Sequence, residues 1–153
     1  QVWNIIEHNE WAVFQSNNSI YFYNTETQKF KIINSPNTIY KIFKVKNRIY
    51  YHVANEGIYA IENGQPKLII ENTIVKEERV INLFESENNL VMLTRHSGFY
   101  KLQNEKISRW EIPADSKLNN VNIFSYIQLK DGSLIIGTIS DGVFHLSKSG
   151  NID

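Results

Sequence analysis

Short apolar stretches separated by polar turns recur along the whole chain. The clearest example is 130–146, where the apolar stretches 134–139 and 143–146 follow the pairs Asp131-Gly132 and Asp141-Gly142. An Asp-Gly pair is a strong turn signal, and apolar runs of about four to eight residues are typical of β-strands. The segment therefore predicts a β-hairpin.

The same hairpin pattern occurs four times. The segments 11–23, 49–61, 90–102 and 134–146 align without gaps, and the residues before their second strands are Ser19, Gly57, Gly98 and Gly142. The spacing is roughly 40 residues, which together with period-2 strands is typical of β-propeller blades. One face of these strands carries Tyr21, Tyr59, Tyr100 and Phe144, and the opposite face carries Ile20, Ile58, Phe99 and Val143. Two apolar faces are expected where a sheet packs between two neighbouring sheets.

The pattern predicts four blades, at 1–34, 39–71, 80–111 and 121–153. The expected strands, in order, are 2–6, 11–15, 20–23, 29–33, 39–45, 48–53, 58–61, 67–70, 80–84, 90–94, 99–102, 106–110, 122–129, 133–139 and 143–146. The polar connection 71–78 is expected to be a surface loop, and Asp115 or Ser116 is expected to cap a short helical turn within 113–120. The fourth blade lacks its outer strand or barely begins it.

We therefore predict an all-β fold, a β-propeller of about four blades with four antiparallel strands each. A fragment of a larger propeller is the preferred interpretation. The alternative is a closed four-bladed ring, because propellers have about four to eight blades. An open segment exposes two sheet faces, which we expect self-association or the rest of a parent propeller to cover.

Composition excludes several classes of function. The chain has 153 residues, with 16 Lys and Arg against 16 Asp and Glu, so its formal net charge is zero and nucleic-acid binding by this segment is disfavoured. The absence of cysteine removes disulfides and thiolate chemistry. No apolar run approaches a membrane span, and Gln1-Val2-Trp3 is not a signal-peptide start. No membrane contact by this segment is expected.

The fourth hairpin also resembles a known family. Residues 129–138 (Leu-Lys-Asp-Gly-Ser-Leu-Ile-Ile-Gly-Thr), followed by Asp-Gly-Val-Phe-His-Leu at 141–146, resemble the two-component regulator propeller repeat. Ile135 stands where that family usually has Trp, and the first three blades lack the Gly-Thr pair. The first blade, through 2–9, 14–16 and 20–24, resembles the middle of such propellers in Bacteroidetes sensor-regulators.

The resemblance implies a location and a function. In those regulators the propeller is the extracytoplasmic sensor. It is typically followed by a triple-tyrosine immunoglobulin-like domain, a membrane helix and a cytoplasmic kinase or LuxR-type helix-turn-helix output. The resemblance covers essentially the whole chain and implies a periplasmic sensor of a membrane-anchored regulator, but it does not identify a ligand.

The four histidines do not form a metal site in this pattern. His8, His52, His96 and His145 occupy four different positions of the repeat, so they are not equivalent ligands in a ring. No cysteine or closely spaced histidine pair accompanies them. No metal and no cofactor are expected.

Polar residues are concentrated in the hairpin loops, and these loops are predicted to lie together on one rim of the propeller. Glycine and Asn, Asp or Ser in these loops first serve the turns themselves. The functional interpretation is that the rim forms a shallow polar surface for a small ligand, and aromatic rings beside amides and charges suit a carbohydrate. The candidate contacts are Asn17, Glu56, Arg95, His96 and Asp141, with Tyr40, Tyr126 and Trp3 as stacking rings. The same aromatic residues also suit blade packing.

Three functions stay open. The preferred one is a non-enzymatic sensor that binds a ligand and passes the signal to an output domain outside this chain. The alternatives are a propeller enzyme acting on polysaccharide, with a catalytic pair on the central channel, and a scaffold that binds another protein. No nucleophile elbow, Ser-His-Asp arrangement or Gly-rich phosphate loop is visible, so no catalytic residue is assigned.

Overall fold

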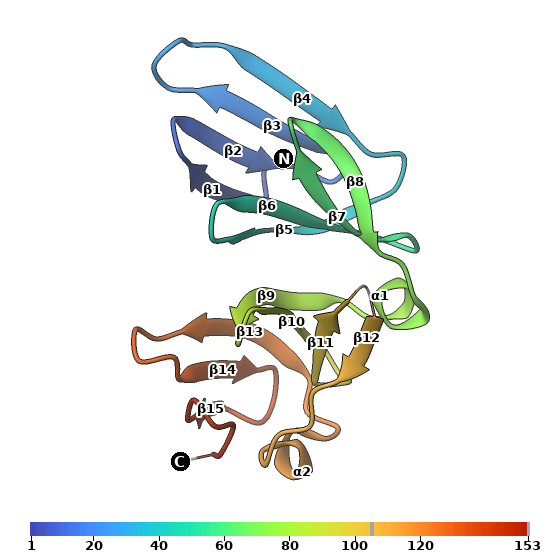
Figure 1. The fold of residues 1–153 in the computed structure, drawn as a ribbon, viewed down its shortest axis with the longest axis vertical. Coiled ribbons are helices and arrows are strands. Elements are labelled where there is room, and N and C mark those ends of the chain that lie inside the picture. Colours follow the sequence, from blue (N-terminus) through green and yellow to red (C-terminus); the bar gives the residue numbers. More distant parts are fainter. Residues whose placement is uncertain (105, 153) are drawn as a thin grey trace. The chain divides into compact units, whose positions relative to one another are not determined.

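The computed structural model describes residues 1–104 and 106–152, which form two compact units, 1–79 and the residues from 80 onward (Figure 1). Each unit contains two antiparallel sheets in which consecutive strands are neighbours. Four such sheets confirm the predicted all-β class. Two-residue turns join strands in direct register in hairpins such as 4–15, where His8 lies opposite Trp11, whereas the next hairpin, 11–24, has a longer loop between Gln15 and Ile20.

The first unit contains two four-stranded sheets and a short helix. The first sheet is formed by β1 (Asn4–His8), β2 (Trp11–Gln15), β3 (Ser19–Asn24) and β4 (Phe30–Asn34). The second is formed by β5 (Ile39–Val45), β6 (Arg48–Val53), β7 (Gly57–Glu62) and β8 (Gln65–Ile70), and α1 (Thr73–Glu77) follows it.

The second unit repeats this arrangement with a shorter last sheet. Its first sheet contains β9 (Val80–Ser86), β10 (Asn89–Thr94), β11 (Phe99–Gln103) and β12 (Lys106–Arg109). After α2 (Asp115–Leu118), the last sheet has the three strands β13 (Ile123–Gln128), β14 (Leu134–Thr138) and β15 (Val143–Leu146). The outer strand of this sheet is barely begun within the described residues, as the sequence predicts, and it consists of one bridge between Leu146 and Ile152.

Two connections differ from the prediction. The segment 71–78 is not simply a surface loop, because α1 forms there and the side chain of Val75 is fully buried. Asn72 caps this helix by accepting a hydrogen bond from the Val75 amide at 3.1 Å. Ile74 and Val75 are adjacent apolar residues in an otherwise polar stretch, and such a pair carries no helical period from which the helix could be predicted. The helical turn expected within 113–120 is present as α2, but its N-cap is Ala114 rather than Asp115 or Ser116.

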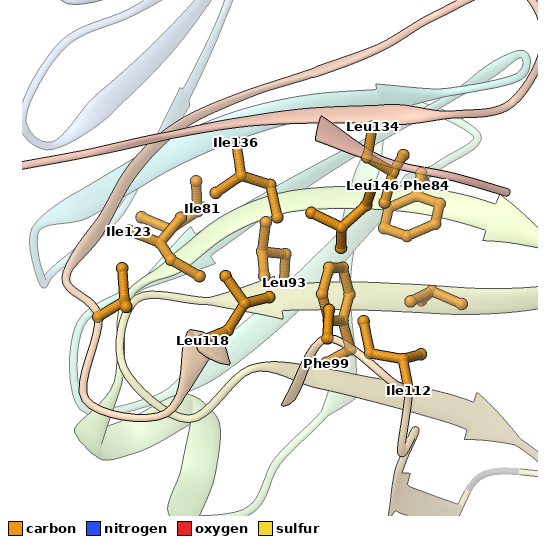
Figure 2. Close-up of a cluster of buried hydrophobic side chains, with 13 residues drawn as sticks. Ile81, Phe84, Leu93, Phe99, Ile112, Leu118, Ile123, Leu134, Ile136 and Leu146 are labelled. Carbon is orange, nitrogen blue, oxygen red and sulfur yellow. The ribbon is translucent and has the colours of Figure 1, made fainter. Parts of the chain in front are cut away.

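Each unit has its own hydrophobic core between its two sheets. In the first unit, residues such as Ile20 and Phe22 pack with Ile42 and Val53. In the second, Phe84, Leu93 and Phe99 pack with Ile136 and Leu146, as Figure 2 shows. The buried glutamine Gln15 joins the first two sheets by donating to the Ile39 carbonyl at 2.9 Å and accepting from the Ile42 amide at 3.1 Å.

The expectation of two buried faces is wrong for the first and last sheets. Ile20, Ile58 and Phe99 are fully buried, whereas Val143 at the equivalent position is 70% exposed. On the opposite face Leu146 is fully buried, whereas Tyr23 is 36% exposed. The first sheet therefore buries only the Ile20 face, and the last sheet buries only the Leu146 face.

Candidate functional site

The predicted rim residues of the first unit fall into small hydrogen-bonded groups. The indole N–H of Trp3 donates to Asn17 Oδ1, and the Asn17 carbonyl accepts from the Ile39 amide at 2.6 Å. Trp3 is nevertheless 57% exposed, so more than half of the residue's surface is open to solvent. A stacking role for Trp3 stays a prediction.

Glu56 and Tyr40 have different partners. Glu56 accepts a hydrogen bond from Asn37 Nδ2 at 2.6 Å and another from the hydroxyl of Tyr59, which ties the hairpin loop to the chain that enters β5. The Tyr40 ring meets the buried His52 ring edge-on at 5.1 Å, and the guanidinium of Arg79 lies 4.6 Å from the Tyr40 ring centre. The Arg79–Tyr40 pair is a cation–π contact at the surface.

The second unit places its predicted residues on two loops and one strand. Arg95 Nε donates to Asn122 Oδ1 at 2.7 Å, and His96 beside it is exposed. Asp141 is exposed in the β14–β15 hairpin, where its amide donates to Thr138 Oγ1 at 2.9 Å. Arg95 and Asn122 thus link a hairpin loop to the connection before β13.

Tyr126 differs from the other candidates because it packs between sheets. Its ring stacks on Phe84 with centroids 5.6 Å apart and an interplanar angle of 22°. Burial raises the pKa of its hydroxyl above the ordinary value. This arrangement matches the packing interpretation that the sequence left open for the aromatic residues.

Two equivalent threonines close the rim loops of the second unit. Thr94 Oγ1 donates to the Gly98 carbonyl at 2.9 Å and accepts from the Ser97 amide at 3.1 Å. Thr138 repeats both contacts, to the Gly142 carbonyl at 2.8 Å and from the Asp141 amide at 2.9 Å. In the Gly-Thr pair of the fourth hairpin the threonine closes the turn, and Thr94 does the same after Leu93. Gly137 instead leaves room for the Ser125 side chain, which a Cβ would overlap.

A pocket that the sequence analysis missed lies at the opposite ends of the strands in the first unit. It has a volume of about 340 Å³ and is lined from both sheets, with His8, Trp11 and Lys31 from the first and Asn47 and Asn63 from the second. The sequence shows its residues only as members of separate strands and turns. Their convergence depends on how the two sheets pack.

Two further properties concern the described part of the chain. No group of three His, Asp or Glu side chains there is arranged to hold a metal ion. None of the helices formed by residues 1–104 and 106–152 has the length and hydropathy needed to cross a bilayer.

Comparison with known proteins identifies the fold. No family model and no curated protein matches the sequence. Among solved structures, the extracellular domain of BT4673, described as a hybrid two-component system from B. thetaiotaomicron, matches with a TM-score of 0.71 and 19% identity, covering 99% of this chain and 22% of that one. The extracellular domain of BT3049, a hybrid two-component system of the same organism, matches with a TM-score of 0.66 and 18% identity, covering 99% and 21%.

An enzyme has an equally similar fold. Streptogramin B lyase matches with a TM-score of 0.71 and 17% identity, covering 99% of this chain and 53% of the lyase. The chain thus spans about a fifth of the two extracellular domains and about half of the lyase. At these identities the matches establish the β-propeller fold, and the fold alone does not assign a function.

Proposed function

We propose that this chain is part of the extracytoplasmic sensor propeller of a two-component-type transcriptional regulator and has no enzymatic activity. The observation that supports this most directly is the match of 99% of the chain to the extracellular domain of BT4673, with a TM-score of 0.71. The resemblance of residues 129–146 to the regulator propeller repeat points independently in the same direction. On this proposal the protein lies in the periplasm and is anchored to the membrane outside this chain.

The sensor's ligand, on this proposal, binds at the hairpin rim. Trp3 and Tyr40 supply exposed or half-exposed rings, and Asn17, Glu56 and Asn37 supply hydrogen-bonding groups around them. Aromatic rings beside fixed amides and carboxylates suit a carbohydrate. Its sugar ring stacks on an aromatic ring, and its hydroxyls form hydrogen bonds with the amides and carboxylates. Arg95, His96 and Asp141 are the candidate polar contacts on the hairpin loops of the second unit, considered by itself. Ligand binding would then bias the conformation passed to the output domain.

The unburied sheet faces need a partner, and we assign the rest of a parent propeller to them. On the outer face of the first sheet, Ile5, Phe14, Tyr21 and Ile32 lie directly opposite one another across its four strands. Ile5 is 61% exposed and Ile32 is 46% exposed. The last sheet similarly exposes Ile127 and Val143. Apolar rows of this kind are what one blade presents to the next, and self-association covers them when no further blade is present.

The alternative is an enzyme, and the specific observation that favours it is the match to streptogramin B lyase. A propeller enzyme acting on polysaccharide would need a catalytic pair, and none of the rim groups forms one. A protein-binding scaffold is the remaining alternative, and it would use the same rim without a small ligand.

The first test is the sequence of the parent gene on both sides of this chain. The sensor proposal expects further propeller repeats, a membrane helix and a kinase or helix-turn-helix domain. A gene without a membrane helix and output domain would refute it.

The second test is a binding and turnover assay of the purified protein with a panel of oligosaccharides. Binding should change tryptophan fluorescence through Trp3 and leave the oligosaccharides intact by mass spectrometry. Arg95→Ala and His96→Ala should weaken binding if the rim contacts are correct. Cleavage products would instead establish the enzyme alternative.

A further inference from the structure

The pocket of the first unit has an apolar base formed by both sheets. The rings of Trp11 and Phe22 meet edge-on, with centroids 6.2 Å apart and an interplanar angle of 79°. Ile49 and Ile61 line the pocket from the second sheet. The indole N–H of Trp11 donates to Glu10 at 3.1 Å, which fixes the ring in the wall. A fixed indole beside aliphatic side chains offers a surface for the C–H face of a small ring.

Three asparagines surround this base, each from a different turn. Asn9 belongs to the β1–β2 turn, Asn47 to the β5–β6 turn and Asn63 to the β7–β8 turn, and all three are exposed. Asn9 and Asn63 adopt left-handed backbone conformations, with φ of 52° and 50°. A short turn of this kind fixes the backbone position from which the side chain extends. Each amide offers both donors and an acceptor, which is the combination that recognises hydroxyl groups.

The charged groups at the pocket are cationic. Lys31 Nζ donates to the Gly64 carbonyl and retains two further N–H donors. Lys44 Nζ donates to the Glu7 carbonyl at 2.8 Å, close to His8. Among the described residues that line the pocket none is a carboxylate. The adjacent Glu10 is engaged by Trp11, and Glu62 pairs with Lys67 at 3.2 Å.

His8 adds an unsatisfied polar atom at this position. Its Nδ1 is buried and has no hydrogen-bond partner within the described part of the protein. Burial, and then the charge of Lys44, lower the pKa of His8, whereas the nearby Glu10 acts to raise it. A buried ring nitrogen without a partner is destabilising unless water or a ligand pairs with it.

We propose that this pocket binds a sugar acid, a small ring that carries several hydroxyls and one carboxylate. The ring packs against Trp11, the hydroxyls bond to the asparagine amides, and the carboxylate lies at Lys31 and His8. A volume of about 340 Å³ is within the range of about 300–1,000 Å³ that small-molecule sites occupy. This site is separate from the hairpin rim and does not depend on the sensor proposal.

The test is a ¹H–¹⁵N NMR titration of the 153-residue protein. D-glucuronate is the probe, and D-glucose is its uncharged counterpart. Saturable shifts are expected for the amides of the three turns, with glucuronate binding at least tenfold more tightly than glucose. Lys31→Gln should reduce this preference to less than about threefold. Asn47→Asp, which keeps the side-chain shape and adds a negative charge, should weaken glucuronate binding at least tenfold.

A matched control is available in the second unit. Asn88 occupies the second position of the two-residue β9–β10 turn, as Asn47 does in the β5–β6 turn, so Asn88→Asp makes the same change away from the pocket. It should leave binding unchanged. No saturable shift at millimolar glucuronate, equal binding of glucose, or equal effects of Asn47→Asp and Asn88→Asp would each overturn the proposal. Unchanged amide spectra outside the turns establish that each variant is folded.

Discussion

His52 Nε2 donates a hydrogen bond to the carbonyl oxygen of Val75 at 2.7 Å, and this contact attaches α1 to strand β6. Both side chains are fully buried. The titratable ring of His52 is therefore buried against the connection 71–78.

The first prediction concerns pH. Burial is the main cause that lowers the pKa of His52 from 6.5 to about 4. The hydrogen bond to Val75 acts to raise this pKa, and the positive charge of Arg79 lowers it further. The unfolded chain binds a proton at His52 below about pH 6.5, and the folded protein does so only near pH 4. The free energy of unfolding should therefore decrease by up to about 3 kcal/mol as the pH is lowered from about 6.5 to about 4.

Chemical unfolding of His52→Gln at pH 7 and pH 4.5 tests this directly. Glutamine can donate to Val75 but does not titrate, so the variant should lose less stability on acidification than the wild type. His96→Gln, which changes an exposed ring, is the control and should behave like the wild type. Equal acid sensitivity of the wild type and His52→Gln would contradict the prediction.

The second prediction compares the two hairpin threonines. Thr94 is fully buried, whereas Thr138 is only partly buried. Thr94→Val should lower the free energy of unfolding by about 1–3 kcal/mol, since the Gly98 carbonyl and Ser97 amide lose a buried partner. Thr138→Val should lower it by less than about 1 kcal/mol, because water replaces the hydroxyl. Urea unfolding of both variants measures the difference, and a larger effect at Thr138 would be inconsistent with this explanation.

The third prediction concerns two hairpin glycines with different surroundings. Gly57 has φ of 150°, and a Cβ there would overlap the carbonyl oxygen of Ile70. Gly142 has φ of 77° with open space around the Cβ position. Gly142→Ala should cost about 1–2 kcal/mol from backbone strain alone, and Gly57→Ala should cost more because β8 must also shift. Thermal unfolding midpoints give the order, and equal midpoints would show that the overlap is relieved without strain.

The fourth prediction concerns the uncovered sheet faces. Phe30 is 59% exposed and Val143 is 70% exposed, so the isolated chain should associate as its concentration rises. Phe30→Lys combined with Val143→Lys should shift the protein toward monomer in sedimentation velocity. Thr27→Lys adds a charge in an exposed turn and should not change association. A wild type that is monomeric at all concentrations would rule out self-association through these faces.

Most of the fold was predictable from local information. Period-2 alternation and turn residues such as Asp131-Gly132 act over a few neighbours, so strands 39–45, 48–53 and 143–146 match the predicted bounds. The first strand lies at Asn4–His8 rather than 2–6, because its ends depend on pairing with Trp11–Gln15. The helix at Thr73–Glu77 was missed because burial of Val75 supplies its stability.

The sequence by itself determined the repeat, the all-β class and the hairpin loops, because strand alternation and turn chemistry are properties of adjacent residues. It also determined which loops carry Asn17, Glu56, Arg95, His96 and Asp141. Only the tertiary structure decided that Tyr126 stacks on Phe84 and that Gln15 bonds across to a second sheet. It alone brought His8, Lys31, Asn47 and Asn63 to one pocket, since packing between sheets joins residues whose separation along the chain carries no local signal.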